Sequence, residues 1–300
     1  MGTLVLVCSS NFSGSTMLDL MLGSHPRAFS VGEVQAWYRP EQEHHLRIVC
    51  PCGQRPCPAW EQLRDLPARH LHRDVLAKMD KDVVVDSSKD PSWVHDAARW
   101  AARDGLDVRH VVIWKDPVAL AHSYWKRGSP LALWRKHQLD YYERLRQLRV
   151  PLVGVRVEEL AADPVATLRR LSEALDIPFE AGQERFWDGD LHPLFGNLRT
   201  RHQVEAGAST IRREERFEPG FDAVRPEVER MLAEDERLRS VVTWLESLGL
   251  AHGASTRDAA ATGPGRRVMP WWYYRNAVWK AVRRVMLRPP WRPGRANGSA

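Results

Sequence analysis

The chain has 300 residues, of which 43% are hydrophobic and 27% are charged, and its net charge at pH 7 is +6. Nine basic residues and no acidic one lie in 264–300, so residues 1–263 together carry a charge of −3. Because the basic excess is confined to the end of the chain, we expect no nucleic-acid partner for its body. The length suits one α/β domain of about 250 residues plus an appendage. No apolar run reaches the roughly 18 residues of a membrane-spanning helix.

The first predicted elements are a strand and a helix joined by a loop of small residues. Residues 4–7 are apolar without alternation, which is typical of a strand buried on both faces of a parallel sheet. Apolar residues recur at helical spacing from Met17 to Leu22. The hydroxyl-rich loop 9–16 contains Gly14 and precedes a helix N-terminus, a combination that favours binding of phosphate or sulfate. A simple strand-to-helix turn capped by Ser13 is the alternative.

This loop differs from the phosphate-binding loop of nucleotide triphosphatases. That loop needs a Lys directly before the Ser or Thr that holds the metal, whereas Gly14 is followed here by Ser15 and Thr16.

Further strands and helices alternate along the chain. Strands are expected at residues 83–85, 108–113 and 151–157, and helices at 69–79, 93–102, 226–232 and 238–248. Lys89 and Lys115 each follow a strand and stand in a Lys-Asp-Pro sequence. In open α/β sheets ligands bind beyond the carboxyl ends of the strands, so both lysines are candidates for a ligand site.

Four stretches in this order resemble the sulfotransferase family, in its bacterial type and its tyrosylprotein sulfotransferase branch. Ser13-Gly14-Ser15-Thr16, followed by His25-Pro26, resembles the 5′-phosphosulfate loop. Residues 83–91 resemble the family's strand with its Lys-Asp-Pro turn, and residues 110–123 its 3′-phosphate segment. Gly196-Asn197, with Arg199 two residues on, resembles the element that closes over the nucleotide. Together the matches span residues 3–201.

The resemblance implies transfer of a sulfuryl group from 3′-phosphoadenylyl sulfate to an acceptor hydroxyl, without a metal. It places the 5′ end of the donor on Ser13, Gly14, Ser15 and Thr16 and the nucleotide end on Lys115, Ser123, Asn197 and Arg199. Lys89 would neutralise charge on the bridging oxygen, and Glu33 would take the proton of the acceptor hydroxyl. For Glu33, a structural role at a helix start is the alternative.

The expected fold is a P-loop-NTPase-like three-layer α/β sandwich with a central parallel sheet of four or five strands, in which residues 4–7, 83–85 and 108–113 are neighbouring strands.

Two positions depart from the family pattern. Phe12 stands where the family has a basic residue, and Lys115 stands where it has Arg. Phe12 keeps open a second function, that of a non-catalytic membrane-surface protein that binds nucleotide. The rival enzyme function is a P-loop-type small-molecule kinase, against which the missing Lys of the loop and the missing metal-binding pattern weigh.

Three cysteines lie close together at Cys50, Cys52 and Cys57. We interpret this stretch first as a structured loop beside the active site, as in bacterial relatives that it resembles. A metal site, completed by His44 or His45, is the second interpretation.

Domain boundaries are expected near residue 250. Residues 1–250 form the sulfotransferase domain, 251–267 a flexible linker, and 268–300 a basic, aromatic and amphipathic tail. The tail has the pattern of a helix that lies at an anionic membrane surface, and docking on the enzyme or on a second subunit is the alternative. With no signal peptide expected, we place the chain in the cytoplasm, at the inner face of the membrane if the tail binds there. A glycolipid or a saccharide then becomes the favoured acceptor.

Overall fold

The structure, a computed structural model, describes residues 2–47, 50–197, 200 and 217–249. Arg199, the predicted linker and the predicted tail lie outside the described residues. Five strands form the central sheet: β1 (Thr3–Cys8), β2 (Ala28–Gly32), β3 (Val83–Asp86), β4 (Asp107–Trp114) and β5 (Val153–Arg156).

All of these strands are parallel, and their order is β2-β3-β1-β4-β5. Leu4 pairs with Val84 on one side and with Val108 on the other. The predicted neighbours of β1 are therefore confirmed, as is the fold class. Because the strands are parallel, the loops that follow them gather at one edge of the sheet.

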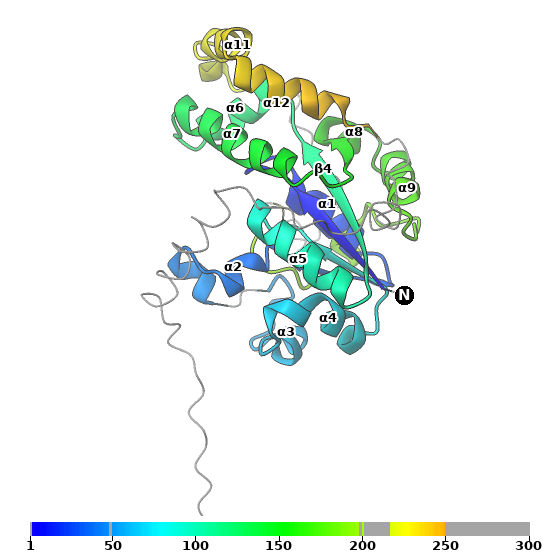
Figure 1. The fold of residues 1–300 in the computed structure, drawn as a ribbon. Helices are drawn as coiled ribbons and strands as arrows, with labels where there is room; N and C mark the ends of the chain where they lie inside the picture. Colours follow the sequence, from blue (N-terminus) through cyan, green and yellow to red (C-terminus); the bar gives the residue numbers. More distant parts are fainter. Residues whose placement is uncertain (1, 48–49, 198–199, 201–216, 250–300) are drawn as a thin grey trace, which may run out of the picture.

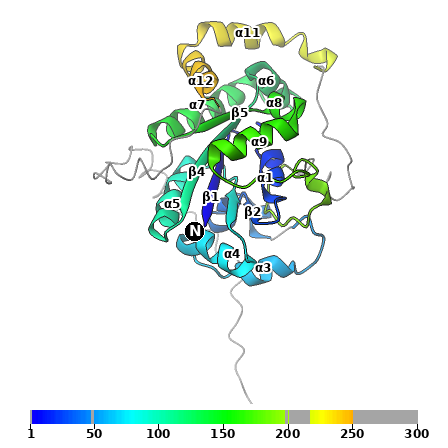
Figure 2. The ribbon, with the colours of Figure 1, turned by 90° about the vertical axis from the view of Figure 1, so that its right-hand side faces the viewer.

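Helices cover both faces of the sheet (Figures 1 and 2). The longer helices are α1 (Ser15–Gly23), α4 (Leu71–Met79), α5 (Pro91–Arg103), α6 (Pro117–Trp125), α7 (Leu131–Gln147), α9 (Pro164–Leu175), α11 (Arg225–Glu234) and α12 (Glu236–Ser247). Short helices are α2 (Gln35–Tyr38), α3 (Pro58–Leu63), α8 (Val157–Ala162), and the 3₁₀ turns Glu43–Leu46, Ala68–His70, Phe186–Asp188 and Pro219–Phe221.

The core is divided between the two faces of the sheet. Leu4 and Leu6 of β1 pack against one helical layer, which contains α4, α5 and α7. Val5 and Val7 point to the opposite layer, which contains α1, α8 and α9. Alternate residues of a strand face opposite sides, so an apolar run without alternation is what a strand covered on both faces requires.

Three helices begin with the same Asp-Pro pair. The side chains of Asp90, Asp116 and Asp163 accept backbone N–H groups at the starts of α5, α6 and α9, and Pro follows each at the first helical position. Such Asp caps satisfy donors that have no partner within the helix, and Pro suits a position whose N–H is not needed. In the first two cases the cap fixes the turn that directly follows a Lys, at residues 89 and 115.

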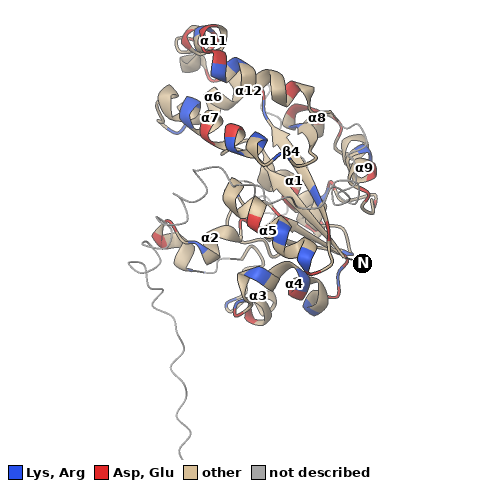
Figure 3. Ribbon diagram, in the orientation of Figure 1, with Lys and Arg blue, Asp and Glu red and all other residues tan. Residues whose placement is uncertain are grey.

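The structure adds detail that the sequence analysis above did not predict. Residues 28–32 form the edge strand β2, and the aromatic-rich stretch after Lys115 forms the two helices α6 and α7. On the outer helices, Lys and Arg are interspersed with Asp and Glu (Figure 3). Among the described residues, no helix has the length and apolar character needed to cross a membrane.

Candidate active site

A pocket of about 360 Å³ lies where the loops after β1, β2 and β3 meet. It brings together Gly14, Ser15, Thr16, Glu33, Lys89 and Asn197, six of the ten residues that the sequence predicted for the site. Its other lining residues are Asn11, Phe12, Met17, Arg127, Gly196 and Thr200. The pocket therefore unites segments that are far apart in the sequence, from Asn11 to Thr200.

The loop after β1 is held in place from behind by α7. The backbone N–H of Ser9 donates to the hydroxyl of Tyr141 (2.9 Å), and Gln138 Nε2 donates to Ser10 Oγ (2.6 Å). Ser10 Oγ in turn lies 2.9 Å from Ser13 Oγ, and both side chains are buried. The Ser13 hydroxyl is thus engaged inside the loop, while Ser15 and Thr16, in the first turn of α1, line the pocket.

The loop turns through an unusual backbone conformation. Phe12 and Gly14 both have positive φ angles, of 66° and 85°. A Cβ on Gly14 would lie 2.5 Å from Cγ2 of Val157, so the position also lacks room for a side chain. Gly14 directly precedes α1 without a side-chain cap, which leaves the first N–H groups of the helix available toward the pocket.

Lys89 and Glu33 form an ion pair inside the pocket. Nζ of Lys89 donates to Oε1 of Glu33, and each side chain is less than one fifth exposed. Glu33 also lies two residues before the first residue of α2, and no side chain forms a capping hydrogen bond to that helix. The sequence predicted both residues for the site but not their direct contact.

The turn that carries Lys89 is fixed by the buried carboxylate of Asp86 at the end of β3. This carboxylate accepts hydrogen bonds from the backbone N–H of Ser88 (2.9 Å) and from Trp93 Nε1 (2.8 Å), and it lies 2.9 Å from His72 Nε2. A buried carboxylate with this many hydrogen-bond partners holds its turn rigidly. Lys89 directly follows Ser88, whose N–H is bonded to this carboxylate, so the turn fixes the position of the Lys89 backbone.

Lys115 and Ser123, predicted to bind the 3′-phosphate, lie together at the carboxyl end of β4. Lys115 Nζ is 3.3 Å from Ser123 Oγ. Lys115 lies before α6, and Ser123 lies within that helix. They lie outside the residues that line the 360 Å³ pocket.

Arg127 connects this pair to the pocket, and the sequence analysis did not single it out. Its NH1 donates to the carbonyl oxygen of Ser123, and its guanidinium carbon lies 4.0 Å from the ring centroid of Phe12. A cation over an aromatic face is attracted by the ring's quadrupole. The available signal was its position four residues after Ser123, in the turn that follows α6.

The segment around Gly196 closes one wall of the pocket. The N–H of Asn197 donates to Thr16 Oγ1 (3.0 Å), and a Cβ on Gly196 would lie 3.0 Å from the same oxygen. The N–H of Glu33 donates to the carbonyl of Leu194 (2.8 Å), which ties this segment to the end of β2. The segment 194–197 thus contacts both Thr16 and Glu33 directly.

A buried carboxyl underlies the pocket. Asp19 of α1 accepts a hydrogen bond from Ser30 of β2 (2.6 Å), and burial raises its pKa from 3.8 to about 7. Hydrogen bonds from Ser30 and Ser87 oppose that rise, and the charges of Asp86 and Glu33 add to it. Asp19 therefore links α1 to strand β2 and to Ser87, which directly follows β3, and it does not line the pocket.

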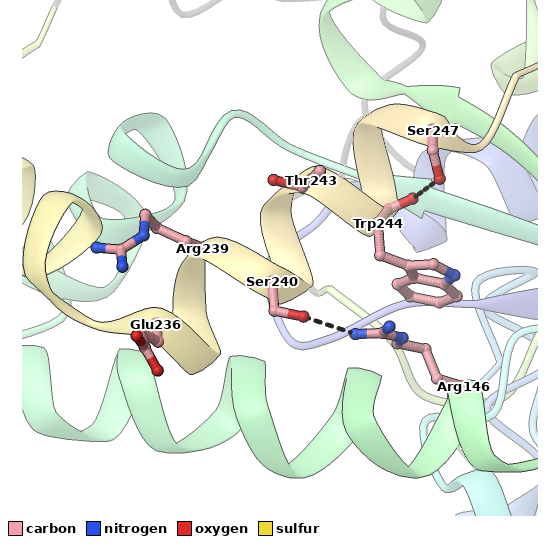
Figure 4. A pocket seen from close by; sticks show the side chains of 7 residues that line it. All are labelled: Arg146, Glu236, Arg239, Ser240, Thr243, Trp244 and Ser247. Atoms are coloured by element: carbon pink, nitrogen blue, oxygen red, sulfur yellow. Dashed lines mark hydrogen bonds between the residues drawn. The ribbon is translucent and has the colours of Figure 1, made fainter.

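A second, wider hollow of about 560 Å³ lies between α7 and α12 (Figure 4). Arg146 donates to Ser240 Oγ there (3.1 Å) and lies over the ring of Trp244 (5.5 Å). None of its lining residues follows a strand of the sheet, so we place the active site in the smaller pocket.

The three clustered cysteines meet His192 rather than His44 or His45. His45 Nδ1 instead accepts from the backbone N–H groups of Glu41 and Gln42. The expected histidine partner was therefore wrong, because the actual one lies in a segment that is distant in sequence and adjacent in the fold.

The chain was compared with protein-family models, curated proteins and solved structures. No protein-family model and no curated protein matches the chain. A sulfotransferase domain from the curacin biosynthetic pathway is 15% identical, with a TM-score of 0.46 over 78% of this chain and 97% of that one. A sulfotransferase domain from the Synechococcus PCC 7002 olefin synthase is 17% identical, with a TM-score of 0.44 over 78% and 95%.

Mouse sulfotransferase SULT7A1, solved in complex with PAP, is 10% identical, with a TM-score of 0.40 over 81% of this chain and 88% of that one. These structural neighbours belong to the family that the sequence motifs resemble. At such identities and TM-scores they do not assign an activity, which has to be argued from the site itself.

Proposed function

We propose that this chain transfers a sulfuryl group from 3′-phosphoadenylyl sulfate to an acceptor hydroxyl. The observation that carries the proposal is the pocket in which the Lys89–Glu33 pair faces the loop at Gly14 and the start of α1. A site for this reaction needs a cradle for an anionic group, a cation at the leaving oxygen and a base for the hydroxyl proton. The residues that line this one cavity offer a candidate for each of the three.

In this proposal the donor's 5′-phosphosulfate binds at Gly14, Ser15 and Thr16. Backbone N–H groups at a helix N-terminus and two hydroxyls provide donors for its oxygens. Ser13 contributes through its backbone, since its hydroxyl is bonded to Ser10. The 3′-phosphate binds at Lys115 and Ser123, whose polar atoms already lie 3.3 Å apart. Asn197 and Arg199 complete this end of the site.

Arg127 supplies the cation that the loop lacks at position 12. Phe12 removes the basic side chain that the family has there, and the guanidinium of Arg127 lies on the Phe12 ring at the same pocket. Phe12 therefore positions a charge that comes from the turn after α6 instead of carrying one itself. Guanidinium groups suit phosphate and sulfate oxygens because they offer several N–H donors in one plane.

The chemical step then follows from the ion pair. The acceptor oxygen attacks sulfur, the bond from sulfur to the bridging phosphate oxygen breaks, and adenosine 3′,5′-bisphosphate leaves. Glu33 takes the proton of the acceptor hydroxyl, and Lys89 stabilises the negative charge that develops on the bridging oxygen. Before the donor binds, the ion pair between Lys89 and Glu33 holds both side chains in the pocket.

Titration calorimetry with adenosine 3′,5′-bisphosphate and with ATP tests the proposal. We expect binding of the bisphosphate that is weakened by Lys115→Ala and unaffected by Lys136→Ala, a control lysine on the exposed side of α7 that pairs with Asp140. Tight ATP binding without bisphosphate binding would favour a small-molecule kinase. Bisphosphate binding without any sulfuryl transfer would favour a non-catalytic nucleotide-binding protein.

The nature of the acceptor depends on the tail. We propose that residues 268–300 lie at an anionic membrane surface, supported by their aromatic and basic sequence without acidic residues. An enzyme held there meets membrane-proximal hydroxyls, so a glycolipid or lipid-linked saccharide is the proposed acceptor.

A further inference from the structure

Four potential metal ligands converge beside the active site. The Sγ atoms of Cys50, Cys52 and Cys57 and a ring nitrogen of His192 all lie within 4.8 Å of one another. His192 Nδ1 is 3.4 Å from Sγ of Cys50 and 3.4 Å from Sγ of Cys57. Ligand atoms of a tetrahedral zinc site, with Zn–S near 2.3 Å and Zn–N near 2.0 Å, are separated by roughly 3.5–3.8 Å. The two Nδ1–Sγ distances of 3.4 Å are already of that size, and no pair of the four atoms is more than 4.8 Å apart.

The histidine is already oriented for ligation. Its Nδ1 faces the thiols, and its Nε2 lies 3.2 Å from Oδ1 of Asp190. Trp60 Nε1 donates to the carbonyl oxygen of His192 (2.6 Å), and the imidazole stacks on Phe29 at 16° between the ring planes. A ligating histidine commonly donates its other ring N–H to a carboxylate, which fixes the tautomer and the orientation of the ring.

We propose that Cys50, Cys52, Cys57 and His192 bind one zinc ion. Three thiolates and one imidazole form a soft donor set that favours zinc over magnesium or calcium, which prefer oxygen ligands. Four protein ligands fill a tetrahedral shell and leave no position for substrate, so the ion is structural and takes no part in sulfuryl transfer. Cys50 and Cys57 are buried, which suits a closed site.

The ion would join two segments that are more than 130 residues apart in the sequence, the cysteine loop 50–57 and the segment that runs from Asp190 to Asn197. The second segment reaches the active site directly: Leu194 forms a bridge with Gly32, its N–H donates to Val31 (3.2 Å), and Asn197 bonds to Thr16. Zinc would thus fix the wall of the pocket formed by Gly196 and Asn197.

Metal analysis of the full chain tests the site without reference to activity. Protein made without a polyhistidine tag and purified without chelators should contain about one zinc ion per chain by mass spectrometry. Cobalt exchanged into the site should give the absorption of tetrahedral thiolate coordination. Less than about 0.1 zinc per chain, both as purified and after incubation with zinc, would overturn the proposal.

Variants identify the ligands. Cys57→Ser and His192→Ala should lose the metal, and Asp190→Asn should weaken zinc binding by roughly tenfold because it removes the carboxylate behind the imidazole. His45→Ala and Cys8→Ala are matched controls that remove a nearby histidine and a thiol outside the cluster, and both should retain zinc. If the control variants lost zinc as fully as His192→Ala, the assignment would be wrong.

A disulfide is the competing use of the same thiols. The sequence has four cysteines, so unfolded, metal-free protein should react with four equivalents of a thiol reagent, whereas a disulfide would leave two. Chelation should also lower the Tm and increase proteolysis at the cysteine loop and at residues 190–197. An unchanged Tm in protein from which zinc has been removed would contradict the structural role.

Discussion

Asp19→Asn should change how the stability of this protein depends on pH. Asp19 is buried beneath the pocket, and its pKa rises from 3.8 to about 7 in the folded chain. The folded state therefore binds a proton that the unfolded state releases between these two values, so Asp19 makes the free energy of unfolding fall as pH rises through that range. A shift from 3.8 to about 7 corresponds to about 4 kcal/mol in total.

Roughly 2.5 kcal/mol of this effect should appear between pH 5 and pH 8. Asn cannot ionise, and its oxygen can still accept the hydrogen bond from Ser30. The free energy of unfolding of the variant, minus that of the wild type, should therefore increase by about this amount as pH rises from 5 to 8.

Urea unfolding followed by tryptophan fluorescence at several pH values measures the difference between the two proteins. Taking the difference removes the contributions of the other titrating groups. Asp65→Asn is a suitable control, because that carboxylate is 90% exposed and should leave the pH dependence unchanged. Parallel pH profiles for wild type and Asp19→Asn would refute the reasoning and show that Asp19 ionises at its ordinary pKa.

The remaining predictions concern the pocket and the tail. Lys89→Ala should lower kcat by about 10²–10³-fold with little change in bisphosphate affinity, since its charge acts mainly on the transition state; a loss of affinity alone would contradict this role. Lys115→Ala should instead weaken bisphosphate binding, with a dissociation constant raised about tenfold in calorimetry, and should change kcat little. Arg127→Ala should reduce donor binding or turnover at least as much as Phe12→Leu does. If Arg127 were only a packing residue, Phe12→Leu would have the larger effect. A chain ending at Thr262 should lose co-sedimentation with anionic vesicles while keeping bisphosphate affinity, and equal binding by both forms would leave the tail without a membrane role.

The strands that line the middle of the sheet could be predicted because burial on both faces requires an apolar sequence without alternation. The edge strand β2 (Ala28–Gly32) was missed, since Ser30 and Gly32 interrupt its apolar run and serve local contacts instead. Positions for Lys89 and Lys115 followed from the rule that ligands collect at the carboxyl ends of parallel strands.

Tertiary contacts account for what the sequence could not provide. Arg127 lines the pocket because its guanidinium lies on the ring of Phe12. His192 lies beside the cysteines because the chain returns to Cys57 after 135 residues. The contact between Lys89 and Glu33 likewise joins two loops whose separation in space no spacing pattern records. In each case the residue type was visible and its partner was not.

Transfer of labelled sulfate tests the proposed function most directly. Wild-type protein, incubated with sulfur-radiolabelled 3′-phosphoadenylyl sulfate and a membrane extract, should move the label to an acceptor and release adenosine 3′,5′-bisphosphate in equal amount. Lys89→Ala should reduce that transfer by about 10²-fold or more while still binding the bisphosphate, and the control Lys136→Ala should transfer as the wild type does. Equal labelling by wild type and Lys89→Ala, or labelling by neither when both bind the bisphosphate, would contradict sulfuryl transfer at this pocket.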